Sequence, residues 1–264
     1  MTEVIKEGKS FMKSVLITGA TSGIGYELSK LFYKSGYLLI LVGRNNEKLE
    51  QTRKQLEKNK MAQEVILICE DLSEIDAAKR IYEEVKQRGI FVDILINNAG
   101  AGYVGEFVKE DEKQIVEHIH LNIASLTLLT RYFAADMKNK GEGKILNVAS
   151  TGSYHPGPYT SVYYATKAYV LSLTEALYEE LKGAGVQVAS LCPGATKTNF
   201  AAAAGRKDSS IAMSAEAVAK KTFIGLKKNK KHIVPGIKNK LWILIPKWIA
   251  VPFIKKYQKG LLKS

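Results

Sequence analysis

The sequence lacks the features of an exported or metal-binding protein. Among its 264 residues there are only two cysteines, Cys69 and Cys192, which lie far apart in separate apolar runs with no Cys-x-x-Cys or Cys/His cluster near either. A disulfide framework and a metal site are therefore not expected, and the pattern is typical of a reduced, cytoplasmic protein. The first 13 residues contain no apolar segment of the kind found in secretory signals, so export is not indicated.

Acidic residues are scarce in the last part of the chain. Residues 206–264 contain 15 lysines and arginines against only Asp208 and Glu216, an excess equal to the whole formal net charge of +13. This asymmetry favours the C-terminal part, rather than the neutral remainder, for contact with an anionic surface. Because the excess is almost wholly lysine and no recognition module is evident, a nucleic-acid partner is not predicted.

An apolar run of membrane-spanning length is also missing near the C-terminus. Residues 241–254 form an apolar stretch of 14 residues that is interrupted by Lys247 and two prolines, too short and broken to cross a bilayer comfortably. Lysines flank it, and Trp242 and Trp248 suit a membrane interface. Two interpretations stay open: a peripheral anchor on the inner, anionic face of a membrane, or a segment that packs across a substrate entrance or against another subunit.

Buried-strand and helical signals alternate along most of the chain, which indicates an α/β fold. Continuous short runs of Val, Ile and Leu predict a mainly parallel sheet of seven strands, covered by helices on both faces. We expect one central domain, residues 13–237, with an N-terminal arm, 1–12, and a basic, apolar extension, 238–264. The expected strands are 15–17, 38–42, 65–68, 94–96, 145–148, 186–191 and 232–234, and the expected helices are 24–33, 47–58, 74–88, 112–137, 162–182 and 215–227.

Three glycines, Gly19, Gly23 and Gly25, lie between the first expected strand and the first expected helix. In such a turn the backbone amides can approach a pyrophosphate, and the positive end of the helix dipole favours that anion. Glycines at a strand-to-helix turn also occur for tight packing alone, so the turn alone is only partial evidence for dinucleotide binding.

A tyrosine and a lysine four residues apart, Tyr163 and Lys167, point to proton transfer. On one helix this spacing places both side chains on the same face, where an ammonium can lower the pKa of a phenol toward neutrality. Ser150, at the end of an expected strand, can donate a hydrogen bond to a substrate oxygen as charge develops there. Such a pair alone is most often two ordinary surface neighbours, whereas the three residues together indicate hydride transfer with a tyrosine acid. Tyr164 has Ala168 four residues on, so Tyr163 is the better acid.

From Thr18 to Gly25 the sequence resembles the short-chain dehydrogenase/reductase family, whose glycine pattern is Thr-Gly-x-x-x-Gly-x-Gly. Further motifs follow in family order over about residues 13–200: Asp71-Leu72, Asn97-Asn98-Ala99-Gly100, Asn122, Ser150, Tyr163-x-x-x-Lys167, and Pro193-Gly194 with Thr198. The resemblance implies a Rossmann-like doubly wound fold and an active site of Asn122, Ser150, Tyr163 and Lys167. It assigns cofactor binding to Thr18, Gly19, Ser22, Gly23, Ile24, Gly25, Arg44, Asn45, Asp71, Leu72, Asn98, Ala99, Gly100, Tyr163, Lys167, Pro193, Gly194 and Thr198.

The resemblance also implies individual roles. Asp71 would hydrogen-bond the adenine, Asn98 would support the central strands, and Thr198 would hold the nicotinamide carboxamide. Lys167 would bind the nicotinamide ribose, and Asn122 would hold a water near it to complete a proton route. Two of these assignments have plain structural alternatives, because Asp71 can simply cap the next helix and residues 97–100 can form only a turn.

The end of the second expected strand favours NADP(H) over NAD(H). Gly43 stands where NAD-preferring members of the family usually carry an acidic residue. Arg44 can instead pair with a 2′-phosphate through its forked guanidinium, and Ser22 and Asn45 can add hydrogen bonds. An arginine at a strand end is otherwise usually a solvated surface residue.

The principal hypothesis is therefore an NADP(H)-dependent oxidoreductase that interconverts a carbonyl and a primary or secondary alcohol, with an apolar substrate. The contrasting hypothesis is a non-catalytic NADP(H)-binding sensor that acts at a membrane or on a protein partner.

The resemblance suggests a homodimer or homotetramer, and loops 102–105 and 196–210 are expected near the ligand. The candidate pocket residues are Tyr154, His155, Tyr159 and Phe200, whereas His118 and His120 are expected on a helix surface or at a subunit interface.

Overall fold

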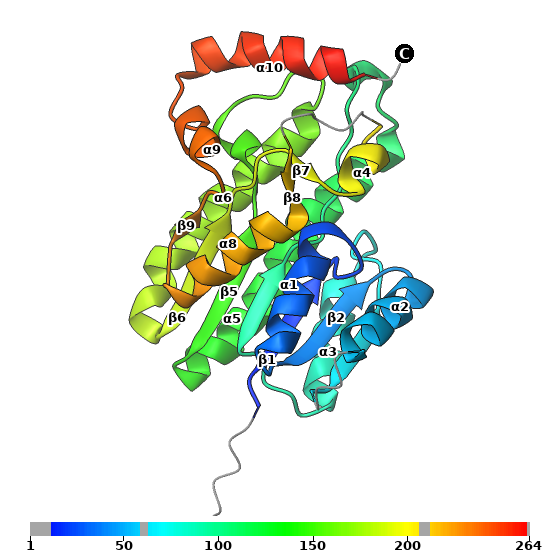
Figure 1. Cartoon of the computed structure of the whole chain (residues 1–264), viewed down its shortest axis with the longest axis vertical. Coiled ribbons are helices and arrows are strands. Elements are labelled where there is room, and N and C mark those ends of the chain that lie inside the picture. Colours follow the sequence, from blue (N-terminus) through cyan, green and yellow to red (C-terminus); the bar gives the residue numbers. More distant parts are fainter. Residues whose placement is uncertain (1–11, 59–62, 206–211, 263–264) are drawn as a thin grey trace, which may run out of the picture.

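The computed structural model describes residues 12–58, 63–205 and 212–262 (Figure 1). Of the predicted N-terminal arm only Met12 is among them, and residues 206–210 of the second predicted loop lie outside the described residues. The last two residues of the predicted C-terminal extension lie outside them as well.

Seven parallel strands form the central sheet in the order β3-β2-β1-β4-β5-β6-β9, which confirms the predicted doubly wound fold. The strands are buried on both faces because their continuous Val, Ile and Leu runs offer no polar face to water. The strand order reverses between β1 and β4, and ligands of such sheets bind outside the carboxyl ends of the strands at this point. The strands are β1 Ser14–Thr18, β2 Leu38–Gly43, β3 Val65–Cys69, β4 Ile94–Asn97, β5 Gly143–Val148, β6 Val186–Leu191 and β9 His232–Ile233.

Helices cover both faces of the sheet, as predicted (Figure 1). One face carries α1 Gly23–Lys34, α2 Asn46–Glu57 and α8 Ala215–Lys227, and the other carries α3 Ala77–Gln87, α5 Leu126–Lys140 and α6 Ser161–Leu181. Apolar residues at helical spacing face the sheet: Leu28 and Phe32 of α1 are buried on one side, and Leu129 and Phe133 of α5 on the other.

The single helix predicted for residues 112–137 is divided in the structure. Helix α4 (Glu112–Ile119) and α5 are joined by a π-helical turn, η2 (His120–Ser125). Such turns occur frequently at functional sites, and this one contains the fully buried Asn122. Apolar periodicity does not distinguish one π-turn from a continuous α-helix, which is why the division was missed.

The C-terminal extension forms two helices beyond the carboxyl ends of the strands, α9 (Ile237–Trp242) and α10 (Lys247–Leu261) (Figure 1). Pro246 is the N-cap of α10, a position that suits proline, whereas Pro252 lies inside the helix. No helix among the described residues is long and apolar enough to cross a membrane. The shorter elements are η1 Phe107–Lys109, η3 Thr151–Tyr154, η4 Lys182–Ala184, β7 Thr196–Lys197, α7 Phe200–Ala203 and β8 Met213–Ser214.

Candidate active site

The glycine turn between β1 and α1 has the shape of an anion-binding loop. Gly19 and Gly23 have φ angles of 64° and 55°, in the left-handed region that favours glycine. A Cβ on Gly23 would lie 2.7 Å from Cγ2 of Thr198, and one on Gly25 would collide with the Gly19 carbonyl. The first turn of α1 has no acidic residue, and the side chain of Ser22, its N-cap, makes no capping hydrogen bond. The positive end of this helix is therefore left for an external anion such as a pyrophosphate.

Hydrogen bonds join the glycine turn to the segment after β4. Thr18 Oγ1 accepts from the backbone amides of Asn98 and Ala99, both at 2.9 Å. Asn98 Nδ2 donates to the carbonyls of Thr18 at 2.9 Å and Gly19 at 3.2 Å. The two loops that flank the reversal point of the sheet are thus fixed relative to each other.

The residues assigned to the adenosine end of the cofactor have structural partners of their own. Asp71 Oδ1 accepts from Ser73 N at 3.0 Å and Ser73 Oγ at 2.7 Å. Helix α3 begins after a different residue, Asp76, so capping of that helix does not account for Asp71. Arg44 Nη1 lies 3.9 Å from Asp71 Oδ2, and the Arg44 side chain is 76% exposed. Asn45 caps α2 by accepting from the amide of Lys48 at 2.8 Å.

Lys167 is buried in the centre of the candidate site. Its Nζ donates to the Val148 carbonyl at 2.7 Å, and burial lowers the pKa of its ammonium to about 8. A Cβ on Gly100 would lie 3.2 Å from this Nζ and 3.1 Å from Asn122 Oδ1. Gly100 therefore lies against both side chains, and a larger residue there would press on them.

Asn122 is held in place by the loop after β4 and by α6. Its Oδ1 accepts from Ala101 N at 3.0 Å, and its Nδ2 donates to the Ala101 carbonyl at 2.8 Å and to Thr166 Oγ1 at 3.1 Å. Thr166 in turn donates to the Tyr163 carbonyl at 2.8 Å. This chain of contacts connects the π-turn to the helix that carries the proposed acid.

Tyr163 and Lys167 lie on one face of α6, as their spacing predicts. Lys167 Nζ is 5.8 Å from the centre of the Tyr163 ring. The ring also lies close to Phe200, with 5.2 Å between ring centroids, and to Gly102, where a Cβ would lie 2.8 Å from Tyr163 Cδ2. Phe200 of α7 thus contacts the proposed acid directly.

The backbone of Ser150 is connected to α6 through Ser153, a residue that sequence reasoning missed. Ser150 Oγ accepts from Gly152 N at 3.0 Å, and Ser150 N donates to Ser153 Oγ at 3.2 Å. Ser153 Oγ donates to the Lys167 carbonyl at 2.7 Å, which ties the end of β5 to α6. A serine three residues after an N-cap serine is the sequence signal for such a reciprocal cap.

Residues 151–160, here called the substrate loop, contain three of the candidate pocket residues. His155 is buried, and its Nε2 lies 3.3 Å from the Trp242 carbonyl. Tyr154 Oη lies 3.8 Å from Cys192 Sγ, and burial raises the pKa of both groups, that of Cys192 to about 11. Tyr159 has a φ of 65°, an uncommon conformation for a residue with a side chain. The substrate loop therefore contacts α9 through His155.

The two other candidate histidines, His118 and His120, contact other residues. His118 Nδ1 is 3.5 Å from Glu110 Oε1, and burial raises the pKa of that carboxyl. His120 Nδ1 is 3.4 Å from the Leu72 carbonyl, which also accepts from Ser125 Oγ. No cluster of three or more potential metal ligands occurs among the described residues.

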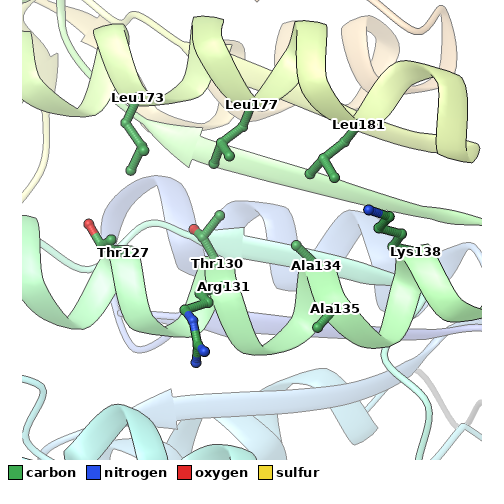
Figure 2. Close-up of a pocket in the computed structure, with 9 residues that line it drawn as sticks. All are labelled: Thr127, Thr130, Arg131, Ala134, Ala135, Lys138, Leu173, Leu177 and Leu181. Atoms are coloured by element: carbon green, nitrogen blue, oxygen red, sulfur yellow. The ribbon is translucent and has the colours of Figure 1, made fainter.

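A groove of about 270 Å³ lies between α5 and α6, away from the residues described above (Figure 2). Leucines 173, 177 and 181 of α6 point toward α5 across it, where Thr130 and Ala134 face them (Figure 2). Its apolar lining contains neither Tyr163 nor Lys167, so the groove is not the catalytic cleft.

Comparison with known proteins identifies the family. A family model for the short chain dehydrogenases matches residues 13–209, so the chain belongs to that family, whose members are oxidoreductases that act on CH–OH groups with NAD(P). The chain is 29% identical over 255 residues to a very-long-chain 3-oxoacyl-CoA reductase of Rattus norvegicus, covering 93% of this chain and 80% of that protein.

Two solved structures share the fold over most of both chains. A short-chain dehydrogenase from Sphingobium yanoikuyae in complex with NADPH has a TM-score of 0.82 and 28% identity, and covers 96% of this chain and 97% of its own. A short-chain dehydrogenase/reductase from Burkholderia phymatum in complex with NAD has a TM-score of 0.79 and 26% identity, and covers 88% and 92%. The family thus takes either dinucleotide.

Proposed function

We propose that the chain is an NADP(H)-dependent oxidoreductase that interconverts an apolar carbonyl compound and its alcohol. The observation that carries the proposal is the buried Lys167, which lies with Asn122 against Gly100 and shares a helix face with Tyr163. Burial of a cation costs free energy, and ionisable groups perturbed in this way cluster at functional sites. Here the ammonium shares a helix face with a phenol, Tyr163.

The residues at the glycine turn fit a dinucleotide. Gly19, Gly23 and Gly25 leave no room for side chains, and the start of α1 offers unpaired amides and a positive dipole end. Arg44 is exposed at the end of β2 with a forked guanidinium, which supports the preference for a 2′-phosphate. When bound, the dinucleotide supplies or accepts the hydride.

We assign the catalytic roles as follows. Tyr163 protonates the developing alkoxide in reduction, and in oxidation it takes the proton from the alcohol. Lys167 stabilises the negative charge that this leaves on the phenol, and Ser150 donates a hydrogen bond to the substrate oxygen. Asn122 and Ser153 are positioning residues, because their hydrogen bonds hold the loop after β4, the end of β5 and α6 together.

The residues near Tyr163 and the name of one relative support an apolar carbonyl substrate. Phe200 contacts the ring of the proposed acid. We propose Tyr159 of the substrate loop as a further pocket residue, whereas the hydroxyl of Tyr154 faces Cys192. The rat relative is named for a very-long-chain 3-oxoacyl substrate. We therefore place an acyl or alkyl chain, rather than a polar sugar, next to Phe200.

The proposal includes assembly of several copies of the chain and a location at a membrane surface. The apolar groove between α5 and α6 supports a homodimer or homotetramer, because such a surface is stabilised when a second copy covers it. The basic C-terminal helices support a cytoplasmic protein that contacts an anionic membrane surface.

The test is NADPH oxidation across a panel of aldehydes and ketones from short and polar to long and apolar. We expect activity that rises with chain length, and a loss of about 10²- to 10⁴-fold in Tyr163→Phe with NADPH affinity nearly unchanged. Tyr164→Phe is the matched control and should keep most of the activity. NADPH binding without turnover on any member of the panel would instead favour the sensor, and full activity in Tyr163→Phe would contradict the mechanism.

A further inference from the structure

Residues 236–262, here called the C-terminal segment, have an inner face that packs on the molecule. Ala250, Ile254 and Gln258 of α10 are buried at successive intervals of four residues, which is one face of a helix. Gln258 Nε2 donates to Tyr164 Oη at 3.3 Å, and Tyr164 is the neighbour of the proposed acid. Helix α10 is therefore attached next to the start of α6.

The segment also contacts two other parts of the site. The Asn239 side chain of α9 lies so close to Gly194 that a Cβ there would collide with it, and Asn239 Nδ2 donates to the Pro235 carbonyl at 2.6 Å. The Trp242 carbonyl faces His155 of the substrate loop, and the two rings meet edge to face at 5.7 Å. The segment thus borders the Pro193-Gly194 motif, the substrate loop and the catalytic helix together.

The exposed side chains of the segment, here together called its outer face, are both apolar and basic. Large apolar side chains are exposed there, with Trp248 at 78% and Leu244 at 76%. Residues 236–262 contain six lysines and no acidic residue. The further exposed apolar residues are Ile237, Leu241 and Phe253, and the lysines are 238, 240, 247, 255, 256 and 259.

We propose that this outer face docks on the surface of an anionic lipid bilayer, so that an apolar substrate enters beneath α9 and α10 from the membrane. The inference rests on the proposed function for its substrate, while the docking itself rests on the surface alone. Exposed tryptophan and leucine side chains can insert at the boundary between the headgroups and the acyl chains of a bilayer, and lysines beside them are attracted to anionic headgroups. A second copy of the chain is a poorer occupant, because its segment would bring lysines against lysines.

The two tryptophans make the proposal directly measurable, since the chain contains no others. In Trp242→Phe the only reporter is Trp248 on the outer face, and in Trp248→Phe it is the half-buried Trp242. With the full-length protein and vesicles of phosphatidylcholine and phosphatidylserine, we expect Trp248 emission to move to shorter wavelength and to be quenched by brominated acyl chains. Trp242 should change little, and vesicles of phosphatidylcholine alone should have a much weaker effect.

Charge variants supply the second measurement. Substitution of Lys247, Lys255, Lys256 and Lys259 by Gln should weaken vesicle binding by at least about tenfold, since each lysine near an anionic surface contributes to the attraction. Substitution of Lys79, Lys109, Lys113 and Lys220 by Gln is the matched control, because it removes four exposed lysines from other surfaces. NADPH affinity is measured on the same samples, so that a variant that misfolds or loses its cofactor site is distinguished from one that loses only vesicle binding.

Two results would overturn docking on a bilayer. One is Trp248 emission that is indifferent to anionic vesicles while NADPH binding is intact. The other is a shift of that emission with protein concentration in the absence of lipid, which would show that a second copy covers the face. Neither result would bear on the reductase itself, which the panel with Tyr163→Phe tests independently.

Discussion

The catalytic site and the C-terminal segment use lysine in opposite ways. Lys167 is buried, hydrogen-bonded to a carbonyl, and has a lowered pKa because burial disfavours its charge. The six lysines of the segment are exposed among apolar side chains, so water still solvates their ammonium groups. Whether a lysine suits proton chemistry or contact with a surface is therefore decided by its burial and its neighbours, rather than by the number of lysines in the region.

The two regions also differ in how they are held. Around Lys167, buried or half-buried polar groups of Thr18, Asn98, Asn122 and Ser153 are joined by hydrogen bonds between segments far apart in sequence. The C-terminal segment is attached mainly by one apolar face of α10 and a few polar contacts at its edge. We therefore expect changes in the first region to affect turnover with every substrate, and changes in the second to affect access and membrane contact.

The largest further effect concerns Lys167 and pH. Its pKa is about 8 in the folded protein and about 10.4 in an unfolded chain, so between these values the unfolded state holds a proton that the folded state has released. The free energy of unfolding contributed by this residue therefore rises with pH across that window, by about 3 kcal/mol in total. Below pH 8 both states are protonated and the contribution is constant.

Urea unfolding of the wild type and of Lys167→Met from pH 7 to pH 11 measures this directly. The variant should lack the rise, so its stability relative to wild type should fall by about 3 kcal/mol over the range. Lys113→Met, whose lysine is exposed on α4, should follow the wild-type curve. Parallel curves for wild type and Lys167→Met would show that the buried ammonium is not destabilised.

A smaller effect is expected at the edge of the cofactor site. Arg44→Ala should raise the Kd for NADPH about tenfold and leave that for NADH within about twofold, because only NADPH carries the 2′-phosphate. The gain from an exposed guanidinium is limited by solvent, which keeps this estimate modest. Arg53→Ala removes a nearby arginine of α2 as the control. Equal losses for the two dinucleotides would show that Arg44 does not distinguish them.

The comparison also explains what the sequence could predict. Short apolar runs are local patterns, so a parallel sheet with helices on both faces could be predicted from them, and the family resemblance added the doubly wound order. Asp71 and Asn45 were harder, because their side-chain contacts depend on short turns: Asp71 bonds Ser73, and Asn45 caps α2. The contact of His155 with Trp242 had no local signal at all, since 87 residues separate them.

The smallest effect tests how firmly the C-terminal segment is attached. Gln258→Leu removes the hydrogen bond to Tyr164 and also a carbonyl oxygen, Oε1, that is buried without a partner among the described residues. Loss of the bond destabilises, whereas loss of the unpaired oxygen stabilises, so the change in unfolding free energy should stay within about 1 kcal/mol. A double-mutant cycle with Tyr164→Phe isolates the bond itself, with an expected coupling of about 0.5 to 1.5 kcal/mol. Zero coupling would mean that α10 is held by its apolar face alone, and a much larger value would mean that the segment belongs to the cooperative core of the catalytic site.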